Sequence, residues 1–264
     1  MCGIAGYSLS PQSSVDRTLA AQSLLAGIAE RGADAVGYAH RTPGAPIEVL
    51  KQRTGATELL DRVRVSAGAT EALVHVRDYT KGHPSIAANN HPIRHGAVVG
   101  IHNGIIANDE EVFARHGFGR AEPEMTVDSE AIFALADATE NRVDALEELY
   151  GTMATAWLDE RRPGLLYLGR GVGRPLWLGR GARETFFAST RLALETVERY
   201  VGLRLQKREV AEGSLLALAD GCVAWSERFR PDKSFVEERS LPPVRAPHEG
   251  ASCLARLAAL AAVA

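Results

Sequence analysis

The stretch that most constrains this chain is its first six residues, Met1-Cys2-Gly3-Ile4-Ala5-Gly6. Removal of Met1 would leave Cys2 with a free α-amine, so that one residue carries both a nucleophilic thiol and a base with a pKa of about 7.7–8.0. Gly3 and Gly6 are expected to leave room for a substrate beside the backbone. The alternative is an ordinary buried cysteine on an N-terminal strand, because cysteine is among the most buried residue types.

The totals restrict the class of protein. A chain of 264 residues forms one large domain or two small ones, and its 45% hydrophobic and 24% charged residues are typical of a soluble globular protein. A net charge of -3 gives no reason to expect a nucleic acid or an anionic membrane as partner. Cys2, Cys222 and Cys253 have no paired spacing, which argues against disulfides or a thiolate zinc site and favours a reducing compartment. Without a leader-like N-terminus or a membrane-length apolar run, the sequence predicts a cytoplasmic protein.

The hydrophobic pattern predicts a strand-rich chain with interspersed helices. The expected helices are 15–30, 57–63, 142–150 and 192–200, with further helix starts at Asn108 and near Asp128; the expected strands are 2–9, 36–41, 47–52, 72–77, 98–101, 152–158, 165–169, 176–178, 185–188, 214–219 and 222–225. The glycine-rich run 169–174 lacks the spacing of a phosphate-binding loop and is interpreted as a hairpin turn with solvated arginines.

Residues that can carry chemistry follow the predicted strands. Arg77 ends one strand with Thr80 just after it, Asn103-Gly104 ends another, and Asp128 begins a helix. Each has an ordinary explanation: Asn-Gly is a common turn, and an aspartate at a helix start is most simply an N-cap or a first-turn acid. Together, an arginine and an aspartate can hold an amino acid by its carboxylate and ammonium, and an Asn amide with a Gly N–H can form an oxyanion hole.

Other catalytic classes fit the sequence poorly. Five of the eight histidines lie in one segment, but there is no HExxH, and Pro92 keeps His91 and His95 off a shared helical face, so no metal is expected. A serine hydrolase would have a GxSxG elbow, which is absent, and a papain-like cysteine would lie inside the chain. No cofactor is expected.

The combination of motifs resembles the class II glutamine amidotransferase (glutaminase) domain of the N-terminal nucleophile hydrolases. It is most similar to the glutaminase half of glucosamine-6-phosphate synthase, with some likeness to the amidophosphoribosyltransferase version. The resemblance covers about 2–223 and is carried, in the order of the family, by Met1-Cys2-Gly3-Ile4-Ala5-Gly6, Arg31-Gly32-x-Asp34-x-x-Gly37, His75-x-Arg77-x-x-Thr80-x-Gly82, Asn90-His91-Pro92, His102-Asn103-Gly104-Ile105-Ile106-x-Asn108, Thr126-x-Asp128-Ser129-Glu130 and Phe187-Ala188-Ser189.

This resemblance implies an α+β fold, a four-layer αββα sandwich with two stacked, mainly antiparallel sheets and helices outside. It implies that Cys2 attacks the side-chain amide of glutamine while its own α-amine relays the proton. The other implied roles are an oxyanion hole from Asn103 and the Gly104 N–H, a clamp on the α-carboxylate and α-ammonium from Arg77 and Asp128, and a pocket lined by Thr80 and Gly82.

Two departures from the family pattern stand out. Asp78 and Lys81 replace an aromatic residue and a histidine in the loop expected to close over glutamine, and a carboxylate beside Arg77 can compete with substrate. The expected domains are a glutaminase domain over 1–225, a charged, proline-containing tail or linker over 226–250 and a helix over 251–264 that docks on the domain or on a partner. Because 226–264 is too short for an acceptor domain, ammonia is expected to go to a separate synthase subunit or to be released.

Two other functions remain open from the sequence. One is a catalytically silent relative that binds glutamine as a sensor or serves as a scaffold. The other is an N-terminal nucleophile hydrolase that acts on a different amide. The Arg77/Asp128 pair favours a free α-amino acid as substrate, and the joint presence of Cys2, Asn103 and Gly104 argues against a scaffold.

Overall fold

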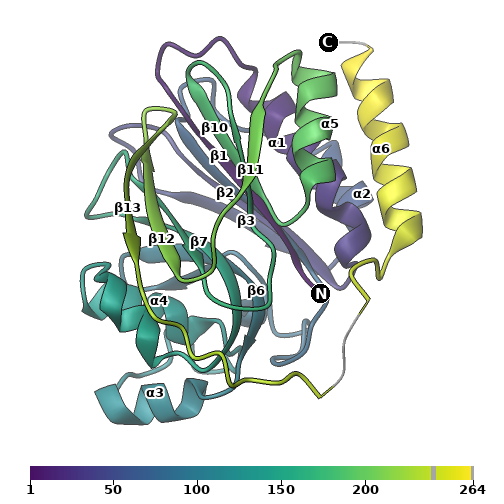
Figure 1. Cartoon of the computed structure of the whole chain (residues 1–264). Helices are drawn as coiled ribbons and strands as arrows, with labels where there is room; N and C mark the ends of the chain where they lie inside the picture. The colour runs from purple at the N-terminus through teal and green to yellow at the C-terminus, as the bar shows by residue number, and fades with distance from the viewer. Residues whose placement is uncertain (239–241, 263–264) are drawn as a thin grey trace.

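Two antiparallel sheets form the centre of the molecule (Figure 1). The computed structural model describes residues 1–238 and 242–262. The first sheet has the order β11 (Gln206–Glu209), β9 (Trp177–Arg180), β10 (Glu184–Ala188), β1 (Gly3–Leu9), β4 (Glu71–Arg77), β2 (Ala35–Arg41) and β3 (Glu48–Gln52). The second has the order β13 (Cys222–Arg228), β12 (Ser214–Ala219), β8 (Leu166–Arg170), β7 (Gly151–Asp159), β6 (Val98–Ile106) and β5 (Ile93–His95).

Helices cover the outer face of each sheet (Figure 1). The first sheet is covered by α1 (Arg17–Ile28), α2 (Ala56–Leu60), α5 (Arg191–Val201) and α6 (Pro247–Ala261), and the second by α3 (Asp109–His116) and α4 (Glu130–Ala138). Short 3-10 helices occupy Ala29–Arg31 (η1), Ala87–Asn89 (η2) and Val143–Glu148 (η3). None of the helices in the described part of the chain is long and apolar enough to cross a membrane.

The strand period of two explains the layering. On β1, Ala5, Tyr7 and Leu9 pack under the helices of the first sheet, whereas Ile4 points the other way. Ile4 joins an apolar cluster between the two sheets that includes Val99 of β6. A third cluster lies between the second sheet and its helices. The central strands are buried on both faces, so both sheets are covered on both sides there, and the expected four-layer αββα sandwich is confirmed.

The glycines of β1 serve packing and not substrate access. A Cβ on Gly6 would lie 2.2 Å from the Ala72 carbonyl oxygen, and one on Gly3 would lie 2.8 Å from Val76 Cγ2 and 2.9 Å from Ile28 Cβ. The neighbouring strand and helix therefore fill the space beside both residues. The prediction that this space admits a substrate is wrong.

The segment 169–174 is not the predicted hairpin turn with solvated arginines, because it leads from β8 of the second sheet to β9 of the first and its arginines are paired. Arg174 is only 6% exposed, and its Nη2 donates to Glu237 Oε1 at 2.8 Å. Arg170 pairs with Glu209 at 2.8 Å. The partners come from distant segments, so the sequence around 169–174 carries no sign of them. The contact with Glu237 also ties part of the 226–250 segment to the body of the domain.

The C-terminal helix α6 packs on its own domain (Figure 1). It begins at Pro247, four residues before the expected start, in keeping with the preference of proline for the first helical turn. Cys253 and Leu257 join the apolar cluster around α1. Glu249 Oε2 accepts from the Thr57 N–H and hydroxyl, both at 3.0 Å, which caps the start of α2. The last two residues of the expected 251–264 helix lie outside the described residues.

Arg41 joins the two sheets at one end of the sandwich. Its Nε donates to Glu71 Oε2 at 2.9 Å, and its terminal nitrogens donate to the carbonyl oxygens of Asp159 at 3.0 Å and Leu165 at 2.8 Å. Arg41 and Glu71 are both buried. Removing one member of such a pair leaves the other as an uncompensated buried charge.

We therefore expect Arg41→Met to lower the free energy of unfolding by about 3–5 kcal/mol in urea titrations. The control is Arg94→Met, which removes a half-exposed ion pair to Glu160 and is expected to cost about 0–1 kcal/mol. Arg41→Met/Glu71→Met should recover part of the loss, because it removes both charges. Equal losses of stability in Arg41→Met and Arg94→Met would contradict the role of Arg41 as a buried link between the two sheets.

Candidate active site

Cys2 lies immediately before β1, at the edge of a small cavity. Its carbonyl oxygen accepts from Arg31 Nε at 2.8 Å, and its thiol donates to the Asp78 carbonyl oxygen at 3.4 Å. The ammonium of Met1 forms an ion pair with the Asp78 carboxylate. Asp78, one of the two residues that depart from the family pattern, thus contacts the amine of Met1 directly.

Burial raises the pKa of the Cys2 thiol. The hydrogen bond to the Asp78 backbone and the positive charges of the N-terminal ammonium and Arg77 act in the opposite direction without cancelling that effect. The thiol is therefore protonated near neutral pH in this arrangement. A protonated thiol needs a nearby base to remove its proton when it attacks a bound substrate.

The Arg31-Gly32-x-Asp34 motif holds the loop that follows β4. A Cβ on Gly32 would lie 2.3 Å from the Arg77 carbonyl oxygen, so only glycine permits this approach. The Asp34 N–H donates to that same oxygen at 3.0 Å, and Asp34 Oδ2 accepts from the Tyr79 N–H at 2.9 Å. The sequence motif was assigned by resemblance to the family. The structure shows that its glycine and aspartate hold the backbone of the loop after β4.

Arg77, the last residue of β4, is buried, and its guanidinium is surrounded by oxygens of the loop that follows it. Nη1 donates to Asn90 Oδ1 at 2.6 Å, and Nη2 donates to the carbonyl oxygens of Lys81 at 2.9 Å and of Gly82. Gly82 has a φ of +78°, which lets its carbonyl turn back toward the arginine. The loop is therefore wound around Arg77.

Asn103 and Gly104 were expected to end a strand. In the structure they lie inside β6. They pair with Ala154 and Met153 of β7, and the strand continues to Ile106. Gly104 has a φ of +152°, and a Cβ there would lie 1.9 Å from the Thr152 carbonyl oxygen. The positive φ of Gly104 is therefore accommodated within a ladder whose register does not shift. An Asn-Gly pair is also a turn signal, so the sequence alone does not distinguish the two cases.

The side chain of Asn103 has no hydrogen-bond partner among the described residues, although it is 0% exposed. Both its amide nitrogen and its oxygen are unpaired. Buried polar atoms are nearly always hydrogen-bonded, so a fully buried amide with both polar atoms unpaired calls for an explanation. An amide held ready for a bound group supplies one.

Asp128 is not the N-cap of α4; Ser129 occupies that position. Its Oδ2 accepts from the Ile106 N–H at 2.7 Å, and Oδ1 accepts from the Ser129 hydroxyl at 3.4 Å. Burial raises the pKa of Asp128 to about 6, and the nearby Asp109 adds to the rise. The carboxylate has no ion-pair partner among the described residues.

Three buried histidines, His75, His91 and His102, form part of the same site; they belong to the motifs that carry the family resemblance but were not among the predicted site residues. His75 and His91 stack with ring centres 4.2 Å apart, and His75 Nε2 lies 3.1 Å from the His102 carbonyl oxygen, joining the two sheets. His102 Nδ1 lies 2.8 Å from the Ser129 hydroxyl. Burial lowers the pKa of His75 and of His102 to about 3, so both rings are neutral. The clustering of five histidines within 75–102 was the feature of the sequence that could have indicated their place in the site.

The cavity brings together most of the residues predicted for the site. Its lining includes Cys2, Arg77, Thr80, Gly104 and Asp128, with His91, His102 and Ser129, which were not predicted. Asn103 and Gly82 are not among the lining residues; Asn103 precedes Gly104 in β6, and Gly82 lies against Arg77.

The raised pKa of Asp128 predicts an unusual pH dependence of stability. The folded carboxyl keeps its proton up to about pH 6, whereas the unfolded one loses it near 3.8, so stability from this group falls as pH rises between these values. We expect the stability of Asp128→Asn relative to the wild type to increase by about 2 kcal/mol from pH 4 to pH 7 in urea titrations. The exposed Asp232→Asn is the control. A constant difference for Asp128→Asn would refute the assignment.

Comparisons with known proteins identify the family of this chain. Residues 79–196 match the family described as a glutamine amidotransferase domain. Glutamine–fructose-6-phosphate aminotransferase (isomerizing) of Vibrio parahaemolyticus is 31% identical over 228 residues, which cover 80% of this chain and 35% of that protein. The same enzyme of Escherichia coli is 31% identical over 229 residues, with the same coverage. The chain therefore spans about a third of the length of these relatives.

Solved structures show the same fold. The glutamine phosphoribosylpyrophosphate amidotransferase of Bacillus subtilis, complexed with ADP and GMP, aligns with a TM-score of 0.65 at 20% identity over 86% of this chain and 49% of that one. A structure described as the allosteric regulatory enzyme of purine biosynthesis aligns with a TM-score of 0.67 at 21% identity. The resemblance stated from the motifs is confirmed. This chain carries a class II glutamine amidotransferase domain with the N-terminal nucleophile hydrolase fold.

Proposed function

We propose that this chain hydrolyses the side-chain amide of glutamine through a Cys2 thioester and delivers the ammonia to an acceptor synthase on a separate subunit. The observation that carries the proposal is the placement of Cys2, Arg77, Gly104 and Asp128 around one cavity, beside the unpaired amide of Asn103. A thiol, two opposite charges and an unused amide are the groups that this reaction requires.

The first step is attack of the Cys2 thiol on the amide carbon. Removal of Met1 makes the α-amine of Cys2 the base that takes the thiol proton and gives it to the departing ammonia. The Asn103 amide and the Gly104 N–H stabilise the oxyanion. Water then attacks the thioester carbonyl, which releases glutamate and restores the thiol. Removal of Met1 takes away the ammonium with which Asp78 now pairs, which frees the Asp78 carboxylate beside the new N-terminus.

Substrate recognition rests on two buried charges. Arg77 binds the α-carboxylate, which is a stronger acceptor than the carbonyl oxygens of Lys81 and Gly82 that it contacts now. Asp128 binds the α-ammonium once it is ionised, and Thr80 lines the pocket. Gly82 shapes the loop that presents these groups.

A larger cavity of about 700 Å³ lies next to the site and supports an acceptor on another subunit. It shares Asp78, Tyr79 and Thr80 with the smaller cavity and is closed on the other side by 235–238 and Arg245. The residues after β13 return through α6 to the helices of the first sheet.

The decisive test is glutamate release from glutamine, with the intact mass reporting loss of Met1. We expect Cys2→Ala to lower turnover at least 10³-fold, whereas Cys222→Ala, at an exposed cysteine, retains it. Circular dichroism checks that both variants fold. Absence of turnover in the wild type despite Met1 loss, with or without candidate synthases, would leave the glutamine-sensor function. Turnover of another amide but not glutamine would overturn the assigned substrate.

The pH dependence of substrate affinity provides a second test. Because only ionised Asp128 attracts an ammonium, we expect the KM for glutamine to rise about tenfold per pH unit below the pKa of about 6. Asp128→Asn should bind glutamine weakly, with a KM that does not vary over this range. Steady-state kinetics from pH 5 to 8 measure both. A wild-type KM that stays flat down to pH 5 would exclude Asp128 as the ammonium partner.

A further inference from the structure

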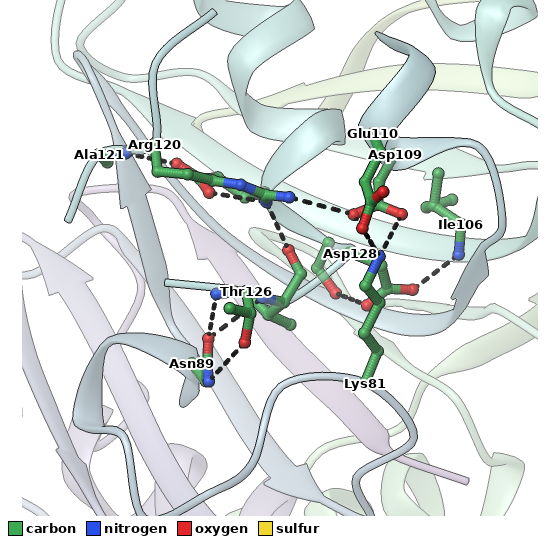
Figure 2. Close-up of polar contacts among 12 residues, drawn as sticks. Lys81, Asn89, Ile106, Asp109, Glu110, Arg120, Ala121, Thr126 and Asp128 are labelled. Atoms are coloured by element: carbon green, nitrogen blue, oxygen red, sulfur yellow. Dashed lines mark hydrogen bonds and ion pairs between the residues drawn. The ribbon is translucent and has the colours of Figure 1, made fainter. Parts of the chain in front are cut away.

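Lys81 links the loop after β4 to the start of α3 (Figure 2). Its Nζ lies 2.7 Å from Asp109 Oδ1 and 2.8 Å from Asp109 Oδ2, and 3.3 Å from Glu110 Oε1. Asp109 is the first residue of α3 and its side chain is buried. Arg120 contributes a second, longer contact to Asp109 Oδ2 at 3.3 Å. The lysine therefore provides the closest cation to a buried carboxylate.

The backbone of Lys81 contacts the group proposed to bind substrate. Its carbonyl oxygen accepts from Arg77 Nη2 at 2.9 Å, and the next carbonyl, of Gly82, accepts from the same nitrogen. One residue thus holds α3 through its side chain and Arg77 through its main chain. Displacement of the side chain would shift the carbonyl groups that orient the guanidinium.

The same ion pair lies close to the other proposed substrate-binding charge. Asp109 comes three residues after Ile106, whose N–H donates to Asp128 Oδ2 (Figure 2). The negative charge of Asp109 raises the pKa of Asp128, and the ammonium of Lys81 lowers it. The Lys81–Asp109 pair is therefore bonded to Arg77 through the Lys81 carbonyl oxygen and acts on Asp128 through its two charges.

An ordinary surface salt bridge would contribute little. Exposed pairs contribute about 0–1 kcal/mol, and Lys81 is itself 39% exposed. This pair differs because both carboxylate oxygens are engaged, Asp109 is buried, and the lysine backbone is bonded to a buried arginine. A buried carboxylate that loses its closest cation is strongly destabilised, which favours movement of the loop.

We propose that Lys81 and Asp109 are positioning residues for glutamine binding, whose ion pair holds the backbone of 78–82 so that Arg77 is presented to the substrate carboxylate. The inference rests on the proposed glutaminase function. It gives a role to Lys81, one of the two residues in this loop that depart from the family pattern. Asp109 supplies the matching charge from the other layer.

The test compares Lys81→Met and Asp109→Asn with Lys81→Arg, which keeps the charge. We expect both charge-removing variants to raise the KM for glutamine about tenfold with kcat changed less than twofold, and Lys81→Arg to stay within threefold of the wild-type KM. The double variant Lys81→Met/Asp109→Asn should be no worse than either single one, because the two residues act as one unit. An unchanged KM in Lys81→Met, or a loss of kcat alone, would overturn the proposal.

Two control variants separate this role from general effects of charge. Lys207→Met removes a lysine–carboxylate pair with Glu198, 2.5 Å apart and remote from the site. Glu110→Gln removes the 80% exposed acid that Lys81 also contacts. We expect both to keep the wild-type KM. A KM change in Lys207→Met equal to that in Lys81→Met would refute a specific positioning role.

A readout that needs no activity separates this proposal from the proposed function. Amide hydrogen exchange of 79–83 should be at least tenfold faster in Lys81→Met than in the wild type, Lys81→Arg or Lys207→Met. If the wild type releases no glutamate, the proposed function fails while this measurement still tests the loop anchor. Unchanged exchange in Lys81→Met would overturn the anchor whether or not the enzyme is active.

Discussion

The site depends on the buried guanidinium of Arg77 and the oxygens gathered around it. Three loop oxygens accept its hydrogen bonds, and its own carbonyl oxygen accepts from the Asp34 N–H. These contacts join β4, the loop after it and the start of β2 into one unit. Arg77 thereby shapes the pocket even before a substrate is bound, because a buried cation organises the dipoles around it.

A second feature of the site is that burial shifts the pKa values of its titratable groups toward their neutral forms. His75 and His102 have pKa values lowered to about 3, and Asp128 has a pKa raised to about 6, in each case mainly by burial. Both histidines are therefore neutral at physiological pH, whereas Asp128 is ionised above about pH 6 and carries the charge opposite to that of Arg77. The raised pKa of Asp128 carries a cost in stability near neutral pH, as is common at functional sites.

Much of the fold followed from the sequence, and the exceptions have physical reasons. Apolar runs predicted most strands, whereas the two-sheet sandwich was implied by the family resemblance; the structure shows that central strands apolar on both faces are covered on both sides. Asn103-Gly104 was misplaced, since a glycine with positive φ looks the same in a turn and within a distorted strand. Gly6 was assigned to substrate access, because the sequence does not reveal that the Ala72 carbonyl fills that space.

The sequence by itself determined the chemistry available to this chain: a cysteine next to Met1, and the ordered motifs that place it in the glutamine amidotransferase family. Motif residues are recognisable because local spacing and identity suffice to define them. Only the tertiary structure decided which groups meet. The burial of Arg174 by Glu237, the unpaired state of Asn103 and the ion pair of Lys81 with Asp109 all depend on contacts between distant segments. Such contacts arise from packing of layers, which no local pattern encodes.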